Sequence, residues 1–192
     1  MYLKYFVYVS SVNNLSDARY CSGMFVDYIG FNFDENSKNH ITIEKFNEIK
    51  NWINGPKIVG EFGNSSWSHT RDYLTEIDVD YISINYHFNN IKSLKKKLII
   101  NIPDLNEVND NLEIITQNSS NVKAVTIDEF DESKIKHIKI LRNYNVFMGK
   151  KETLVQTESV LTKYNFGLKL SGSEELRPGY KLSLIHISEP TR

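Results

Sequence analysis

Polar residues that could do chemistry stand at the ends of short apolar segments along this chain. The set comprises Asn32, Glu61, Asn85, Asn101, Asp128 and Ser171. Amides, carboxylates and hydroxyls gathered at one edge of a sheet can bind a small polar ligand, and a carboxylate there can exchange protons with it. We therefore expect a ligand site where the apolar segments end.

Glu61 and Lys169 are charged residues within otherwise apolar segments. A charge that points into an apolar core is costly unless it has a partner, so we expect the two side chains to pair with each other or with a ligand. Two interpretations of Lys169 stay open. A buried amine can form a Schiff base with a carbonyl compound, whereas a lysine at a strand end often extends its ammonium into solvent.

Strand-like and helix-like segments alternate along the chain, and these elements must position the polar residues. Strands are predicted at residues 3–9, 27–33, 57–62, 81–86, 98–102, 123–128, 145–149 and 167–171. Helices are predicted at residues 15–24, 43–53, 67–77, 89–94, 105–117, 132–143 and 153–164. This alternation predicts an α/β fold, a (β/α)₈ TIM barrel, formed by residues 1–182 as a single domain.

Composition narrows the class of protein. The 192 residues are 40% hydrophobic, which suffices for one buried core, and the net charge of −1 provides no basic field for a nucleic acid. No apolar run approaches the roughly 20 residues that cross a bilayer. Cys21 is the one cysteine, so no intramolecular disulfide is expected. We therefore expect a cytoplasmic protein that binds neither nucleic acid nor membrane.

Four segments, in order along nearly the whole chain, carry a resemblance to a known family. They are NNLSDARY after the first strand, VDYIGFNF at the second, KIVGEFGN at the third and GLKLSGSEELRPGYK at the eighth. The chain resembles the phosphoribosylanthranilate isomerases of tryptophan biosynthesis. The resemblance implies a (β/α)₈ barrel, monomeric or homodimeric, that converts N-(5-phosphoribosyl)anthranilate, a small phosphorylated sugar-amine, by an Amadori rearrangement. It implies no cofactor and no metal.

The resemblance also implies an acid and a base. The family's acid, an Asp on the sixth strand, matches Asp128, and its base, the Cys of a K-I-C-G segment, matches Ser10 in the tetrapeptide YVSS. A hydroxyl is a far weaker acid than a thiol and needs a neighbouring base. Ser10 is therefore either catalytic or a strand-end hydroxyl bonded to backbone or water. Asp128 is either the acid or part of a solvated acidic loop, DEFDE.

Substrate-binding positions follow from the same comparison. Asn39 stands where the family has an Arg that recognises the anthranilate carboxylate, and the fourth strand ends in SINY in place of Q-L-H-G. The Gly-rich loop that follows the sixth strand in the family is replaced by EFDE, whose acids would repel a phosphate. The substrate-binding candidates are Asn32, Asn39, Asn85, Gly149, Ser171, Gly172 and Ser173. Ser and Gly at a strand end also form turns without any ligand, so both interpretations of the last loop stay open.

The end of the chain departs from the family pattern. The family continues past P-G-x-K-D with a final helix, whereas this chain ends in SLIHISEPTR, which looks like the translated read-through of a sequencing adapter. We expect the barrel to lack its final helix and residues 183–192 to be a non-native tail.

Two hypotheses on function follow from these departures. The first is an isomerase of the resembled type with altered catalytic positions. The alternative is a non-catalytic or differently catalytic barrel that binds a phosphorylated small molecule or a protein partner.

Overall fold

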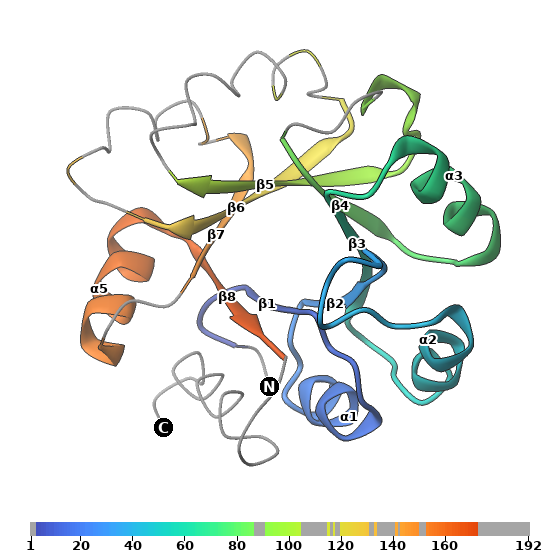
Figure 1. The fold of residues 1–192 in the computed structure, drawn as a ribbon. Helices are drawn as coiled ribbons and strands as arrows, with labels where there is room; N and C mark the ends of the chain where they lie inside the picture. Colours follow the sequence, from blue (N-terminus) through green and yellow to red (C-terminus); the bar gives the residue numbers. More distant parts are fainter. Residues whose placement is uncertain are drawn as a thin grey trace.

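Eight parallel strands close into a barrel in the computed structural model of the chain (Figure 1). The structure describes residues 3–86, 91–104, 120–130, 143–149 and 153–172, and isolated positions between them. The strands are β1 (Val7–Ser10), β2 (Tyr28–Asn32), β3 (Lys57–Gly63), β4 (Tyr81–Asn85), β5 (Lys97–Asp104), β6 (Val122–Glu129), β7 (Asn145–Gly149) and β8 (Gly167–Ser171). Their order around the barrel is their order in the chain, which confirms the predicted (β/α)₈ fold.

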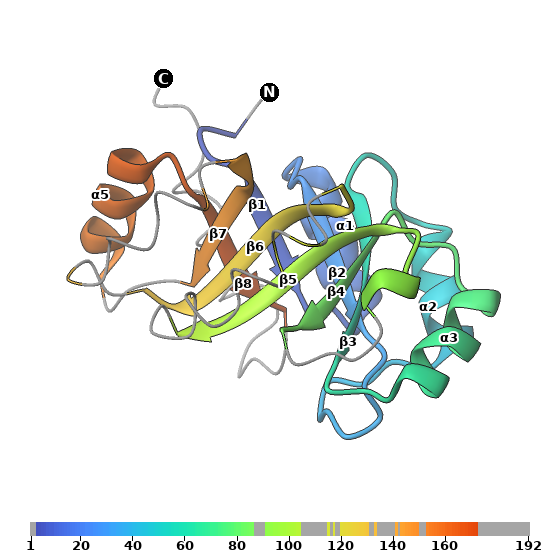
Figure 2. The ribbon, with the colours of Figure 1, turned by 90° about the horizontal axis from the view of Figure 1, so that it is seen from above.

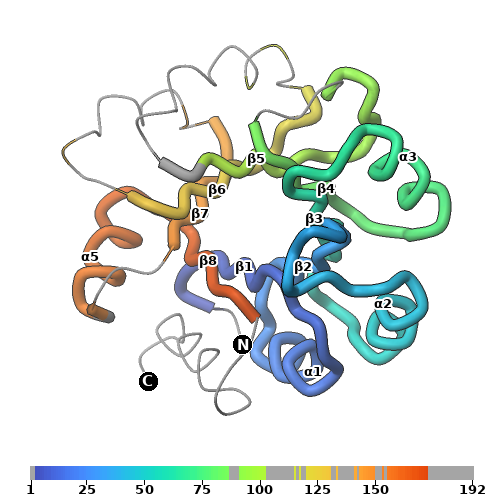
Figure 3. The backbone as a smooth tube through the Cα atoms, viewed as in Figure 1, coloured from blue at the N-terminus to red at the C-terminus, as the bar shows by residue number. Residues whose placement is uncertain are grey.

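The barrel closes between its first and last strands. The pairing of β1 with β8 runs from Val7 opposite Leu168 to Ser10 opposite Ser171. Figure 3 shows this seam as the meeting of the blue start and the red end of the ring. In Figure 2 the strand arrows run away from the side on which the chain begins, so all carboxyl ends lie at one rim.

The described helices lie on the outside of the ring (Figure 1). They are α1 (Leu15–Gly23), α2 (Ile43–Lys50), α3 (Trp67–Glu76) and α5 (Leu154–Tyr164). Each begins with a capping side chain, as at α1, where Asn14 Oδ1 accepts from the backbone N–H of Asp17 at 2.9 Å. These caps explain why the predicted helix starts agree closely with the observed ones.

Several predicted boundaries were wrong. The first strand begins at Val7 instead of residue 3, because the preceding residues run toward α5, where the Tyr5 hydroxyl hydrogen-bonds Thr162 Oγ1 at 2.5 Å. The helix predicted at 89–94 is a single 3₁₀ turn, Ile91–Ser93, in the described part. Strand β5 extends to Asp104, two residues past its predicted end. The helices predicted at 105–117 and 132–143 lie almost wholly outside the described residues.

An apolar layer fills the barrel on the side of the amino ends. Its buried members are Tyr8, Tyr28, Val59, Tyr81, Ile99, Ala124 and Phe147. The Tyr28 ring packs edge-on against Tyr81 and Phe147 with centroids 5.3 and 5.4 Å apart. A Cβ on Gly167 would lie 2.6 Å from the Phe147 ring, so this glycine gives the layer its space. The packed layer confines the polar groups to the carboxyl half of the barrel.

The predictions on chain organisation concern residues after 172. The domain limit at residue 182, the missing final helix and the non-native tail 183–192 all lie outside the described residues, and they stay predictions.

Candidate active site

Inward-facing polar residues form a layer directly above the apolar one. Four of its five members lie two positions further along their strands than a member of the apolar layer, because inward side chains alternate along a strand, and Lys169 lies two positions after Gly167. The members are Glu61, Ser83, Asn101, Thr126 and Lys169. Asp128 and Asn85 lie one further step toward the carboxyl rim, and Ser10 lies two positions after Tyr8 of the apolar layer. A (β/α)₈ barrel holds its ligand at this rim.

Asp128 and Lys169 form an ion pair across the open side of this layer. Lys169 Nζ lies 2.6 Å from Asp128 Oδ1 and 3.2 Å from Asn101 Oδ1. The Asp128 side chain is 44% exposed, whereas that of Lys169 is 17% exposed. The pair therefore presents a carboxylate at the mouth and an ammonium just beneath it.

The predicted pairing of Glu61 with Lys169 was wrong, because Lys169 forms its ion pair with Asp128. The strand register explains this partner. Lys169 on β8 lies opposite Gly149 on β7, and a Cβ on Gly149 would lie 2.7 Å from the backbone oxygen of Asp128. The glycine thus lets β7 lie close against the backbone of Asp128.

A chain of side-chain hydrogen bonds extends from this ion pair along the rim. Thr126 Oγ1 donates to Asn101 Oδ1 at 2.5 Å, Asn101 Nδ2 donates to Asn85 Oδ1 at 3.1 Å, and Asn85 Nδ2 donates to Asn64 at 2.7 Å. The chain brings together residues of β4, β5 and β6 that are far apart in sequence. It fixes the amide of the predicted substrate-binding residue Asn85 beside the mouth.

Glu61 is the buried carboxyl of the layer, with a residue exposure of 7%. Its Oε1 accepts from the Tyr8 hydroxyl, and its Oε2 accepts from the backbone N–H of Ser11 at 2.9 Å and the Ser11 hydroxyl at 3.0 Å. A Cβ on Gly30 would lie 1.9 Å from Oε1, so this glycine on β2 makes room for the carboxyl. Burial raises the pKa of Glu61, while the Tyr8 hydroxyl, the Lys169 charge and Ser11 act in the opposite direction.

Ser10 is buried at the end of β1, and its hydroxyl donates to the backbone oxygen of Leu170 at 3.1 Å. This is the backbone hydrogen bond that the sequence left open as an alternative to a catalytic role. A backbone carbonyl oxygen cannot take the hydroxyl proton, so the hydrogen-bond partner of Ser10 cannot act as its base.

The remaining substrate-binding candidates lie in two loops. Asn32 donates to Ser37 Oγ at 3.1 Å, and the backbone N–H of Asn39 donates to the same oxygen at 3.2 Å, so both residues serve the loop after β2. The N–H of Gly172 donates to the Ser10 carbonyl at 2.7 Å, which commits it to the turn after β8. Ser171 is exposed at the end of β8, and Ser173 lies outside the described residues.

Sequence reasoning missed two members of the site, Tyr8 and Ser11. Tyr8 looks like an ordinary core aromatic of a strand. Ser11 has a positive φ of 55°, a conformation that favours glycine, and it stands where the resembled K-I-C-G segment has its glycine. A serine at a position that calls for glycine was therefore the available signal.

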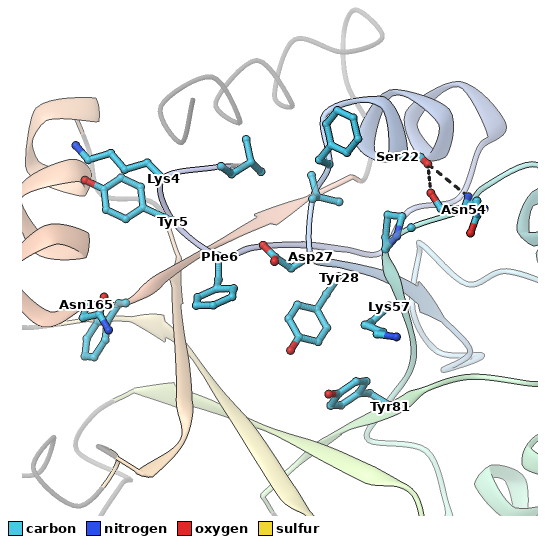
Figure 4. Close-up of a pocket in the computed structure, with 16 residues that line it drawn as sticks. Lys4, Tyr5, Phe6, Ser22, Asp27, Tyr28, Asn54, Lys57, Tyr81 and Asn165 are labelled. Carbon is cyan, nitrogen blue, oxygen red and sulfur yellow. Dashed lines mark hydrogen bonds between the residues drawn. The ribbon is translucent and has the colours of Figure 1, made fainter. Parts of the chain in front are cut away.

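A separate cavity of about 700 Å³ lies at the opposite end of the barrel (Figure 4). Its walls include Tyr28, Lys57 and Tyr81, which are the first residues of β2, β3 and β4. Figure 4 shows the Tyr28 and Tyr81 side chains reaching into the barrel beneath Asp27. The Asp27 carboxylate accepts the backbone N–H of Val7 at 2.8 Å. The apolar layer separates this cavity from the polar rim.

Metal-binding clusters and membrane-spanning helices are both absent from the residues that the structure describes. No group of three or more His, Cys, Asp and Glu side chains is close enough together to hold a metal ion. No described helix combines the length and the apolar character needed to cross a membrane.

The fold and the position of its polar groups define a class, the (β/α)₈ barrels with a polar site at the carboxyl rim. No protein-family model matches the chain, and no curated protein matches it. Solved structures do match. Phosphoribosyl anthranilate isomerase from Thermotoga maritima aligns with a TM-score of 0.72 and 17% identity, over 95% of this chain and 96% of that one.

Two other matching structures carry the same enzyme name. The isomerase from Pyrococcus furiosus aligns with a TM-score of 0.70 and 16% identity, over 96% and 98% of the two chains. A phosphoribosyl anthranilate isomerase in complex with reduced 1-(o-carboxyphenylamino)-1-deoxyribulose 5-phosphate aligns with a TM-score of 0.73 and 18% identity, over 95% of each. These likenesses show a shared fold, and at that level they confirm the resemblance seen in the sequence.

Proposed function

We propose that this chain is an isomerase of the phosphoribosylanthranilate type, which acts on N-(5-phosphoribosyl)anthranilate in tryptophan biosynthesis. The observation that carries the proposal is the alignment with such isomerases over 95% or more of both chains, combined with a carboxylate at the end of β6. Because identity is 18% or less in these alignments, the activity itself rests on the site residues.

The rearrangement needs a proton donor and a proton acceptor at different atoms of the sugar. Ring opening requires a proton on the ring oxygen, and the resulting Schiff base must then lose its C2 proton. We assign the first role to Asp128 together with Lys169, whose ammonium contacts the carboxylate at 2.6 Å and can supply its proton. Ser10 stands at the family's base position, but its hydroxyl faces the Leu170 carbonyl.

Substrate recognition is proposed at the rim of the mouth. Asn85 offers its amide through the hydrogen-bonded chain, while Gly149 and Ser171 end β7 and β8, where a phosphate can meet backbone N–H groups. Ser173, outside the described residues, stays a predicted part of the same site. Asn32 and Asn39 shape the loop after β2, and Gly172 shapes the turn after β8. The proposal requires no cofactor and no metal, and it is compatible with a monomer or a homodimer in the cytoplasm.

Turnover of purified protein tests this proposal. We expect the chain to consume N-(5-phosphoribosyl)anthranilate, and we expect Asp128→Asn to lower kcat/KM by about 100-fold or more, the usual effect of losing an acid or base. Asp72→Asn is the matched control, because Asp72 is an exposed carboxylate on α3 that pairs with its neighbour Arg71. Complementation of a tryptophan auxotroph that lacks the isomerase provides the same test in cells.

Failure of this test has a defined meaning. A folded wild-type chain without turnover would overturn the isomerase proposal and leave the alternative, a barrel that binds a phosphorylated small molecule or a protein partner. Equal turnover by wild type and Asp128→Asn would remove Asp128 from the mechanism.

A further inference from the structure

We propose that the base of this site is the Ser11 hydroxyl, with Glu61 as the group that accepts its proton. The inference rests on the proposed isomerase function and assigns to it two residues that the family comparison does not. Ser11 would contact the substrate, and Glu61 would act through Ser11.

The contacts of the two neighbouring serines decide between them. Ser11 Oγ donates to the Glu61 carboxylate at 3.0 Å, whereas Ser10 Oγ donates to the Leu170 carbonyl at 3.1 Å. A carboxylate can take a proton from a hydroxyl, and a backbone carbonyl cannot. Ser10 is buried, while Ser11 is half-buried at the carboxyl end of the barrel. Ser11 therefore has both the proton acceptor and the access that Ser10 lacks.

The backbone of Ser11 supplies a second, independent observation. Its φ of 55° lies in the left-handed region, which glycine adopts freely and a serine adopts at a cost. The Glu61 carboxylate holds this conformation through two hydrogen bonds from Ser11, one from the backbone N–H and one from the hydroxyl. Strained backbone that is held in place by its surroundings is a feature of functional sites.

Burial favours proton uptake by Glu61, whereas its titratable neighbours Tyr8 and Lys169 favour the carboxylate. Tyr8 on β1 and Lys169 on β8 face the carboxyl as titratable neighbours, and Asp128 on β6 acts on Tyr8 from further away. The other close neighbour is Gly30 on β2, which carries no charge. Burial raises the pKa of Glu61 above its ordinary value, so the carboxylate is a stronger base than an exposed one.

The proton transfer balances without any further reactant. The C2 proton of the protonated Schiff base passes to Ser11 Oγ as the hydroxyl's own proton passes to Glu61 Oε2. The C2–H bonding electrons form the C1–C2 double bond, and the C1–N electron pair returns to nitrogen, which yields the neutral enolamine. The proton on Glu61 is then lost to solvent, and the acid that protonated the ring oxygen recovers one.

Turnover of glycine and alanine variants tests the assignment. Ser11→Gly removes the hydroxyl and also relieves the left-handed strain, so we expect an unchanged or higher Tm with kcat lowered about 100-fold or more. Asn165→Gly is the matched control, because Asn165 is a left-handed residue with φ of 56° that caps α5, and its activity should equal that of wild type. Ser11→Gly with turnover within threefold of wild type would overturn the proposal.

A pH profile separates a base from a structural support. Wild-type kcat/KM should rise with pH through the pKa of Glu61, and Glu61→Gln should lose this acidic limb and fall to the level of Ser11→Gly. The double variant should be no slower than either single one, since both remove the same step. If Ser10→Ala abolishes turnover and Ser11→Gly does not, the base is Ser10.

One measurement is independent of turnover. Carbon-13 NMR of labelled glutamate side chains, with the Glu61 signal identified by its loss in Glu61→Gln, reports the carboxyl pKa directly. Because the Ser11 hydroxyl stabilises the carboxylate, Ser11→Gly should raise this pKa. A Glu61 pKa that does not respond to Ser11→Gly would overturn the dyad even in a chain without isomerase activity, whereas absence of wild-type turnover alone would overturn the proposed function.

Discussion

Glu61 and Asp128 are two carboxyls at the same end of one barrel, and their surroundings are opposite. On the β1–β3 side, Glu61 is buried and accepts hydrogen bonds from Tyr8 and Ser11. On the β6–β8 side, Asp128 is 44% exposed and pairs with the Lys169 ammonium. In the proposed mechanism, burial without a contacting cation suits one carboxyl to accept a proton, while contact with an ammonium makes the other part of a proton donor. The difference separates the two roles that one reaction needs.

The largest expected difference between the two carboxyls is the loss of stability when each is truncated to alanine. Glu61→Ala leaves a buried tyrosine hydroxyl and the Ser11 N–H without their acceptor, and should lower the free energy of unfolding by about 3 kcal/mol. Asp128→Ala removes an exposed partner and should cost about 1 kcal/mol or less. Urea denaturation of both variants measures this. Equal losses would mean that the two sides do not differ in burial as described.

Filling the space beside Glu61 has the next largest expected effect. A Cβ on Gly30 would lie 1.9 Å from Glu61 Oε1 and 2.9 Å from the Tyr8 hydroxyl, so Gly30→Ala should cost about 2 kcal/mol through displacement of the carboxyl. The cost should largely vanish in the Gly30→Ala, Glu61→Ala double variant, because the clash then has no partner. If thermal or urea denaturation shows that the loss of stability in the double variant equals the sum of the losses in the two single variants, the contact between Gly30 and Glu61 is contradicted.

The pH dependence of stability has the smallest expected effect. Burial raises the pKa of Glu61 above its ordinary 4.5, so between these two values the folded protein keeps a proton that the unfolded chain has lost. The free energy of unfolding should therefore fall as pH rises through this window. Glu61→Gln should remove this part of the slope, and the burial-raised pKa of Asp27 contributes equally to both proteins. Urea denaturation from about pH 4 to 8 measures this. If the free energy of unfolding changes with pH equally in wild type and Glu61→Gln, the raised pKa of Glu61 is refuted.

The sequence alone predicts the framework well, because the framework depends on local patterns. Apolar runs such as those of β2 and β3 mark buried strands, and capping residues such as Asn14 and Thr153 mark helix starts. The start of β1 was mispredicted because Tyr5 packs against α5 and Phe6 is exposed, although both look like strand residues in the sequence. A local pattern reports that a side chain is buried, and it does not report on which surface.

The partners within the site could not be predicted, because they depend on register and on one unusual backbone conformation. Glu61 and Lys169 were recognised as charges within apolar segments, but in the barrel Lys169 lies opposite Gly149 of β7 and forms its ion pair with Asp128 of β6. Ser11 meets Glu61 through its positive φ, and the only sequence signal for this conformation was that Ser11 stands where the resembled family has a glycine. Residue types indicated where polar groups would gather, and the fold determined which of them touch.

The seam between β1 and β8 has a consequence for biosynthesis. Tyr8 and Lys169 lie opposite each other across it, and Ser10 is anchored to Leu170. The hydrogen bonds of Glu61 come from Tyr8 and Ser11, near the start of the chain, whereas the ion pair of Asp128 needs Lys169 on the last strand. A nascent chain therefore contains all hydrogen-bond partners of the Glu61 carboxyl early in translation, while the Asp128–Lys169 ion pair and the closure of the barrel must wait until β8 has been made.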